Sequence, residues 1–110
     1  MTYDQNLAER VRAVLIGTDA VTERKMFGGV AFLVGGHMAC GIVGNELMLR
    51  LGNDGAEAAL QEPHSRPMDF TGKPLRSMVY VAHEGFASDA DLRGWVLRGV
   101  GFAKTFPPKS

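Results

Sequence analysis

The chain of 110 residues has a mass of 11.9 kDa, which is enough for one domain and too little for two ordinary ones. Twelve Lys and Arg balance twelve Asp and Glu, and the net charge of zero excludes a strongly basic protein that holds nucleic acid by its overall field. The single cysteine excludes an internal disulfide and a cysteine-cluster zinc site. The sequence shows no apolar run of about 18 residues and no signal-peptide pattern, so it predicts one cytoplasmic domain over residues 1–110 without membrane contact.

The first segment is predicted to form a helix. Its apolar residues recur at the spacing of one helical face, and they are Leu7, Val11, Val14 and Leu15. Thr2 followed by Gln5 resembles a capping box, and Gly17 is expected to end the helix. The charged side chains of Arg10 and Arg12 are expected to face solvent.

Apolar runs punctuated by glycine predict four antiparallel strands in the next part of the chain. These strands cover residues 21–26, 30–34, 38–43 and 47–51. Gly35-Gly36 and Gly44-Asn45 separate the last three runs, and both residue types accept the positive φ that tight hairpins need. The order of the runs therefore predicts a meander.

After the meander, the sequence predicts a short helix and two further strands. Asp54 followed by Glu57 is expected to cap a helix that continues through Leu60. A proline-containing loop separates this helix from strands expected at residues 68–70 and 76–82.

A last helix is predicted to begin at a capping box formed by Ser88 and Asp91. One face of this helix carries Leu92, Trp95, Val96, Gly99 and Ala103. The predicted fold class is α+β, since runs of strands and helices follow one another without βαβ alternation. We expect an antiparallel sheet of about five to six strands, a meander plus a hairpin, with an N-terminal helix, a short middle helix and a C-terminal helix.

The predicted strands are apolar on both faces. In the strand at residues 30–34, Ala31 and Leu33 are apolar although they point away from Val30 and Phe32. Three helices do not easily cover two sheet faces, so we expect a homodimer in which two-fold pairing buries the second face or a sheet edge. An interface of roughly 800 Å² per subunit is enough for a stable dimer.

Four residues around the first hairpin are candidates for a contact surface: Arg24, Lys25, Gly28 and Gly29. A phosphate-binding loop needs a helix after its glycines, whereas a strand is expected after Gly29, so a bulge or tight bend is favoured. Arg24 and Lys25 are the only adjacent basic pair, which is little for direct nucleic-acid binding, and a solvated strand end beside a buried Phe27 is favoured. The expected core anchors are Phe27, Phe32 and Trp95.

The residues that carry metal or nucleophilic chemistry are scattered. The soft ligands are His37, His64, His83 and Cys40. His37 and Cys40 are three apart on a predicted strand, which places them on opposite faces, and a thiol inside an apolar strand is expected to be buried and inert. We therefore expect no metal, no cofactor and no catalytic residues.

Residues 23–32 and the strands predicted after them form a pattern that is typical of a known protein family. Residues 23–32 contain the block Met26-Phe27-Gly28-Gly29. This block is followed by a glycine turn and by the apolar strands predicted at 38–43 and 47–50. This pattern resembles the N-terminal domain of the TfoX competence-regulator family. The resemblance covers almost the whole chain and continues through Pro67-Met68-Asp69-Phe70, Ser77-Met78-Val79-Tyr80 and Trp95. The family often has paired aromatics and a Val-Pro after the last strand, whereas this chain has Val79-Tyr80-Val81-Ala82, so the loop after Ala82 is expected to differ.

The resemblance implies an α+β domain like the independent half of a regulator of natural transformation, without the second helical domain that longer members carry. Our leading hypothesis is a non-enzymatic cytoplasmic interaction domain, a homodimer with an unknown regulatory protein partner. One alternative is a small-ligand-binding or enzymatic domain that uses a cleft between sheet and helices. Another is weak DNA binding through the local basic patch at Arg24 and Lys25.

Overall fold

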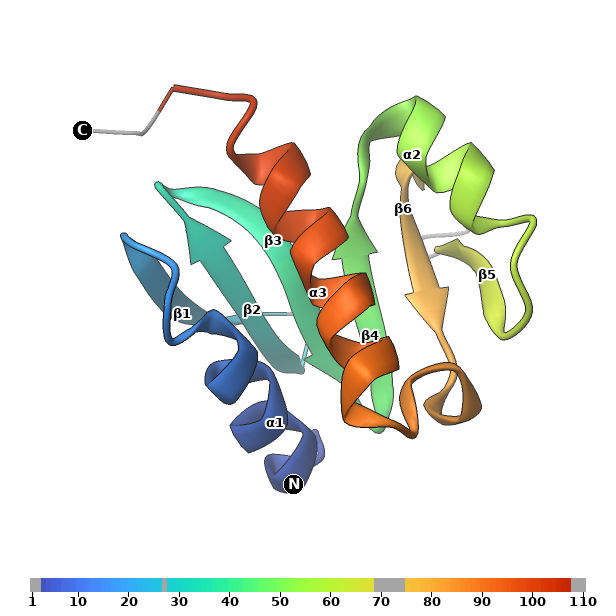
Figure 1. The fold of residues 1–110 in the computed structure, drawn as a ribbon, viewed down its shortest axis with the longest axis horizontal. Helices are drawn as coiled ribbons and strands as arrows, with labels where there is room; N and C mark the ends of the chain where they lie inside the picture. The colour runs from blue at the N-terminus through green and yellow to red at the C-terminus, as the bar shows by residue number, and fades with distance from the viewer. Residues whose placement is uncertain (1–2, 27, 69–74, 108–110) are drawn as a thin grey trace.

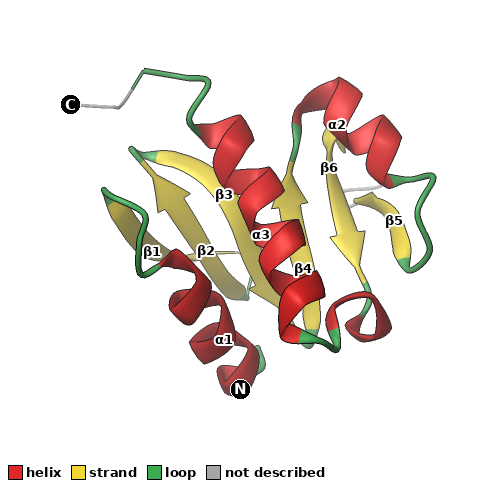
Figure 2. Cartoon of the chain, viewed as in Figure 1, coloured by secondary structure: helices red, strands yellow, loops and turns green. Residues whose placement is uncertain are grey.

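The computed structural model describes residues 3–26, 28–68 and 75–107. Within these ranges six antiparallel strands form one open sheet in the order β1-β2-β3-β4-β6-β5, and the α-helices lie on one of its faces (Figures 1 and 2). The strands are β1 Val21–Met26, β2 Gly29–Val34, β3 His37–Val43, β4 Glu46–Arg50, β5 Ser65–Met68 and β6 Leu75–Val81. The helices are α1 Gln5–Leu15, α2 Gly52–Ala59 and α3 Asp89–Ala103, with a short 3-10 helix, η1, at His83–Phe86. The predicted α+β fold and its order of elements are confirmed.

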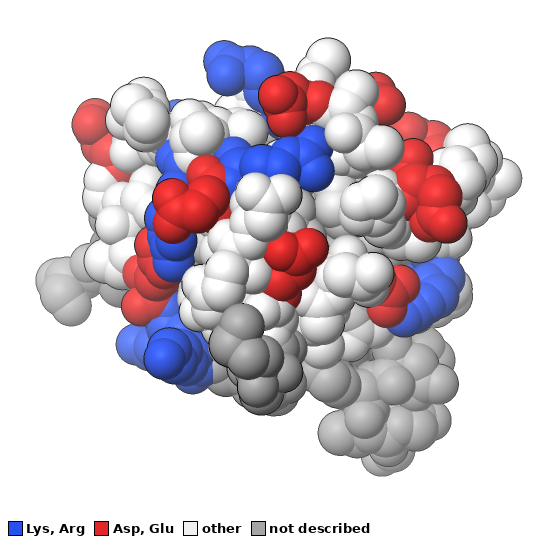
Figure 3. Space-filling model, turned by 90° about the horizontal axis from the view of Figure 1, so that it is seen from below, with Lys and Arg blue, Asp and Glu red and all other residues white. Residues whose placement is uncertain are grey.

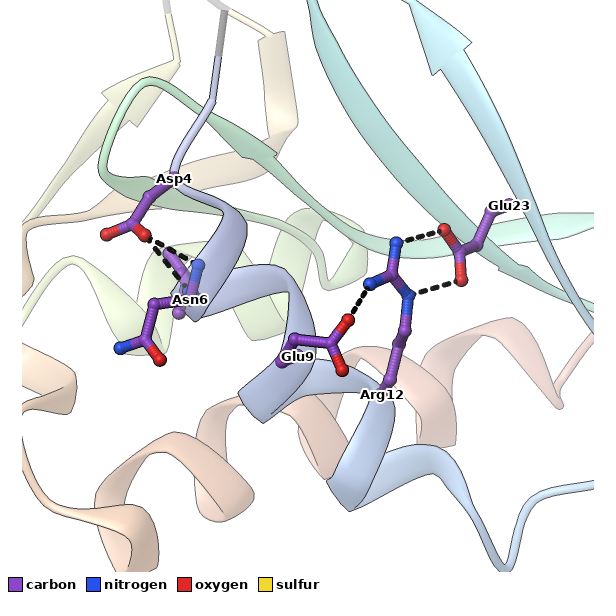
Figure 4. Close-up of polar contacts among 6 residues, drawn as sticks. Asp4, Asn6, Glu9, Arg12 and Glu23 are labelled. Carbon is purple, nitrogen blue, oxygen red and sulfur yellow. Dashed lines mark hydrogen bonds and ion pairs between the residues drawn. The ribbon is translucent and has the colours of Figure 1, made fainter. Parts of the chain in front are cut away.

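The start of α1 differs from the prediction. Asp4, not Thr2, precedes the first turn, and its Oδ1 accepts hydrogen bonds from the backbone N–H groups of Asn6 at 2.9 Å and Leu7 at 3.2 Å (Figure 4). Two cap-forming side chains lie within three residues here, and local sequence does not choose between them. The predicted Thr2 cap lies outside the described residues.

The starts of α2 and β5 differ from the prediction by more than one residue. The predicted Asp54 cap of α2 is wrong, because the helix begins earlier, at Gly52, and has no side-chain cap. Gly52 has φ +78°, and a Cβ atom there would lie 2.6 Å from the Phe102 ring. β5 covers Ser65–Met68, since Ser65 to Pro67 pair with Val81 to Val79 on β6, and residues 69 and 70 of the strand predicted at 68–70 lie outside the described residues. The predicted cap of α3 is correct, since Ser88 Oγ accepts a hydrogen bond from the Asp91 N–H at 3.1 Å.

The main core lies between the helices and the sheet face that they cover. Phe32 on β2 is fully buried there, and Trp95 on α3 is only 7 % exposed. The Trp95 Nε1–H donates to the Gly85 carbonyl at 3.1 Å, so the one polar atom of this side chain has a partner. Phe27, the third expected core anchor, lies outside the described residues.

The opposite face of the sheet carries a second set of buried apolar residues. Ala31, Leu33 and Met48 lie outside the main core, yet Ala31 and Met48 are fully buried and Leu33 is 8 % exposed within a single chain. Among the described residues, the exposed large hydrophobic side chains are Ile16, Leu60 and Leu97, none of which lies on a strand. The argument that a partner must cover an open apolar face therefore does not hold for these residues.

Candidate interaction surface

β1 forms one edge of the sheet, and no described element lies beyond it (Figure 1). It pairs with β2 over six consecutive residues, from Val21 opposite Val34 to Met26 opposite Gly29, without a shift in register. Its side chains from Thr22 to Lys25 are exposed. The other edge strand, β5, has four residues, contains Pro67 and changes register between Pro67 and Met68. Proline and bulges block strand addition, so β1 is the more open of the two edges.

The outer side of β1 presents unpaired backbone groups. Just before the strand, the Gly35 N–H donates to the Ala20 carbonyl at 3.0 Å, which makes these two residues a hydrogen-bonded pair. Hydrogen-bonded and non-hydrogen-bonded pairs alternate along antiparallel strands. The N–H and C=O groups of Val21, Glu23 and Lys25 therefore point away from β2. We call this outer side of Val21–Met26 the β1 edge.

An ion pair ties the β1 edge to α1. Glu23 accepts two hydrogen bonds from the Arg12 guanidinium, from Nε at 2.7 Å and from Nη2 at 2.9 Å, and Arg12 Nη1 also bonds Glu9 (Figure 4). Arg12 lies at the surface as predicted, with its side chain 36 % exposed, but the prediction did not include its ion pairs with Glu23 and Glu9. Arg10 is also held, because its Nη2 donates to the Phe86 carbonyl at 2.9 Å. The pairing of Arg12 with Glu23 fixes the orientation of a carboxylate on the edge strand.

Glu23 should make the stability of the protein depend on pH. The hydrogen bonds from Arg12 lower the pKa of the Glu23 carboxyl below its ordinary value of 4.5. A carboxyl with a lowered folded-state pKa stabilises the fold above its unfolded pKa, and this contribution is lost as pH falls through the folded pKa. We expect Glu23→Gln to be less stable than the natural chain at about pH 6, and this difference to shrink as the pH falls through the lowered pKa of Glu23.

Urea unfolding across this pH range measures the Glu23 effect, and the exposed Glu57→Gln is the matched control. Because Glu23 is partly exposed and screened by water, the effect is expected to be small. If the difference in unfolding free energy between Glu23→Gln and the natural chain stayed constant from about pH 6 to about pH 3, the ion-pair interpretation would be contradicted.

Of the four candidate contact residues, Arg24 and Lys25 are exposed on β1, and the two glycines have backbone roles. Gly28 has φ +74°, a conformation that residues with a Cβ rarely adopt. Gly29 is buried, and a Cβ atom there would lie 2.0 Å from the Ile42 carbonyl oxygen on β3. Gly29 therefore permits the close approach of two strands, and its burial removes it from the contact surface.

Charges of both signs share the surface near α1 and the β1 edge. On the face seen from below in Figure 3, Lys and Arg side chains are interspersed with Asp and Glu, and the described residues form no continuous basic stripe there. Direct phosphate binding needs several cations together. This charge pattern favours a protein contact over a nucleic-acid contact for Arg24 and Lys25.

Three of the hollows on the described surface are smaller than a usual small-molecule pocket, and a fourth, of about 450 Å³ beside Asp54, Glu57, Ala58 and Gln61, is an open depression of the surface. The groove between α1 and α3, lined by Ala13, Val14, Leu92 and charged neighbours, has a volume of about 280 Å³. A hollow beside Trp95 and His64 has about 270 Å³, and one beneath Phe106 has about 220 Å³. Pockets for small molecules usually hold about 300–1,000 Å³ and enclose most of the ligand.

The side chains that could bind a metal ion do not form a cluster among the described residues. Within the described residues, no three His, Cys, Asp or Glu side chains lie close enough to hold a metal ion. The His37 ring stacks on Phe106 at 5.0 Å, with its Nε2 2.8 Å from the Pro107 carbonyl oxygen, so this histidine packs against the end of α3. No helix in the same part of the chain is both long and apolar enough to cross a bilayer.

Cys40 should be unreactive in the folded protein. It is fully buried on β3, and burial raises the pKa of its thiol to about 12. The thiolate is the reactive form, so we expect no labelling of the native chain by a bulky maleimide at about pH 8, and complete labelling in denaturant. Mass spectrometry reads both states, and rapid labelling of the native chain would show that β3 opens or is misplaced.

The comparisons with known proteins agree with this architecture. Residues 13–103 match the family described as the TfoX N-terminal domain. The matched range runs from the last three residues of α1 to the last residue of α3 and includes all six strands. No curated protein and no solved structure matches the chain. Since the match covers most of its length, the chain belongs to the TfoX N-terminal domain family.

Proposed function

We propose that this chain is a non-enzymatic protein-interaction domain that self-associates as a homodimer and contacts a regulatory protein partner. The observation that carries the proposal is the β1 edge, a regular six-residue strand with outward backbone groups and exposed charged side chains. Such an edge binds another chain by adding a strand to the sheet, because main-chain hydrogen bonds supply affinity and side chains supply specificity. The pairing of Arg12 with Glu23 supports this role by ordering the edge before contact.

The regulatory part of the proposal draws on the family. A domain of the TfoX N-terminal family is suited to act on transcription or competence through contacts with other proteins. In this proposal the domain itself catalyses no reaction and acts in the cytoplasm.

Two alternatives predict different measurements. A small-ligand-binding or enzymatic domain would use the hollow beneath Phe106 or the groove between α1 and α3, and a ligand there would raise the melting temperature. Weak DNA binding through Arg24 and Lys25 would appear as complex formation at low salt that disappears as salt is raised. The small volumes of the hollows and the mixed charges favour protein contact over both.

Light scattering after size-exclusion chromatography tests self-association. We expect a mass near twice 11.9 kDa for the full chain at micromolar concentration and above. A mass of 11.9 kDa that does not rise up to several hundred micromolar would overturn the homodimer. Melting-temperature screens with small metabolites and DNA band shifts, run beside it, distinguish the two alternatives.

A further inference from the structure

We infer that the β1 edge binds the β1 edge of a second copy of this chain, antiparallel and in one register, with Arg24 opposite Arg24 of that copy and Glu23 opposite its Lys25. This inference rests on the proposed self-association and names its surface. It predicts one continuous sheet across two chains.

Symmetry restricts how two β1 strands meet. Antiparallel neighbours related by a two-fold axis keep the same sheet face on the same side, so one residue of the strand must lie opposite itself. The side chain on the axis is therefore Thr22, Glu23, Arg24 or Lys25 in the registers that pair most of the strand. The four registers differ in which charged side chains they bring together.

The face on which each β1 side chain lies follows from its partner on β2. Glu23 pairs with Phe32 and Lys25 with Val30, and both partners belong to the main core on the helical side. Arg24 pairs with Ala31, on the opposite face. Glu23 and Lys25 thus lie on one face, two residues apart and opposite in charge.

This charge order selects the register centred on Arg24. With Arg24 on the axis, Glu23 of each copy lies opposite Lys25 of the other, which gives two favourable pairs and one unfavourable Arg24 pair. Glu23 on the axis would bring two carboxylates together and place Lys25 opposite Val21. Glu23 and Lys25 also carry the outward backbone groups, so the two attractive pairs coincide with the new main-chain hydrogen bonds.

Charged residues on an edge strand usually discourage pairing with another strand, because pairing removes the charges from water or brings like charges together. In β1, Glu23 and Lys25 lie two residues apart on one face and carry opposite charges. Antiparallel pairing centred on Arg24 therefore brings the Glu23 of each copy opposite the Lys25 of the other. A six-residue strand buries less than the roughly 800 Å² per subunit of a standard interface, so we expect a dimer at the weak end of specific interfaces, with a dissociation constant on the order of micromolar.

Single cysteines on the β1 edge report the register. In the full chain, Arg24→Cys would bring two sulfur atoms across the axis, where Cα atoms of a non-hydrogen-bonded pair are about 4.5 Å apart and a disulfide fits. Glu23→Cys and Thr22→Cys would place the paired cysteines beyond about 7 Å. Fully buried Cys40 serves as the internal control, because the natural chain should not cross-link.

Under copper–phenanthroline we expect a disulfide-linked dimer from Arg24→Cys at least about ten-fold faster than from Thr22→Cys or Glu23→Cys, read on a non-reducing gel. Faster cross-linking of Glu23→Cys or Thr22→Cys would overturn the register. No cross-link in any variant, with the natural chain still dimeric by light scattering, would overturn the β1 surface but leave the proposed self-association standing. A monomeric natural chain would overturn both.

A second, non-covalent measurement uses two neighbouring substitutions with the same change in charge. Lys25→Gln removes both attractive pairs and should raise the dimer dissociation constant about three-fold or more. Arg24→Gln removes the repulsive pair and should lower it about two-fold. Both residues are exposed on one strand, so a simple dependence on net charge predicts equal effects. Equal shifts in the same direction would contradict the inference.

Discussion

Trp95→Ala is expected to destabilise the protein by about 3–5 kcal/mol. The side chain is 7 % exposed on α3, and its removal leaves a cavity between the helical layer and the sheet. The Gly85 carbonyl that now accepts the indole N–H at 3.1 Å would also lose its donor. The Arg98 guanidinium, 4.5 Å from the ring centroid, would lose the face on which it lies.

Urea unfolding followed by far-ultraviolet circular dichroism measures this loss. The matched control is Leu97→Ala, two residues further along the same helix at a position that is 39 % exposed, where we expect a cost below about 1 kcal/mol. Trp95→Phe keeps most of the packing and isolates the hydrogen bond, at about 1–2 kcal/mol. If Trp95→Ala unfolded at the same urea concentration as the natural chain, Trp95 would not be a core anchor.

Gly99→Ala is expected to destabilise the chain by about 2 kcal/mol although alanine is the better helix former. A Cβ atom at this position of α3 would lie 2.2 Å from the Ala39 carbonyl oxygen on β3, and that oxygen belongs to backbone that cannot rotate away. The helix must therefore move off the sheet. The gain in helix propensity, about 1 kcal/mol, offsets only part of this cost.

Gly101→Ala on the same helix is the control with the opposite sign. A Cβ atom there would meet nothing within 4 Å, so only the helix propensity changes and we expect stabilisation by about 0.5–1 kcal/mol. Thermal unfolding of the two variants beside the natural chain separates a contact effect from a propensity effect. Equal shifts for Gly99→Ala and Gly101→Ala would show that α3 is not held against β3 as described.

Part of the candidate surface could be predicted from sequence. The sequence predicts Arg24 and Lys25 as exposed residues at a strand end, because an adjacent pair of charged side chains is seldom buried. Arg12 as the partner of Glu23 was missed. The two residues are 11 apart on different elements, and no local spacing relates a helix residue to the strand after a turn. Burial of Gly29 was missed for the same reason, since the Ile42 carbonyl against it belongs to another strand.

By itself, the sequence determined the order of the α-helices and strands and the bounds of β1, because helical apolar spacing, short apolar runs and glycine turns are local properties of the chain. It also determined the Ser88 cap of α3, a contact within one turn. Only the tertiary structure decided that β1 is an open edge and β5 a blunted one, and that Ala31 and Met48 are buried without a partner chain. Strand order and burial depend on contacts between residues far apart in sequence, and the local spacing of apolar residues does not indicate which segments pack together.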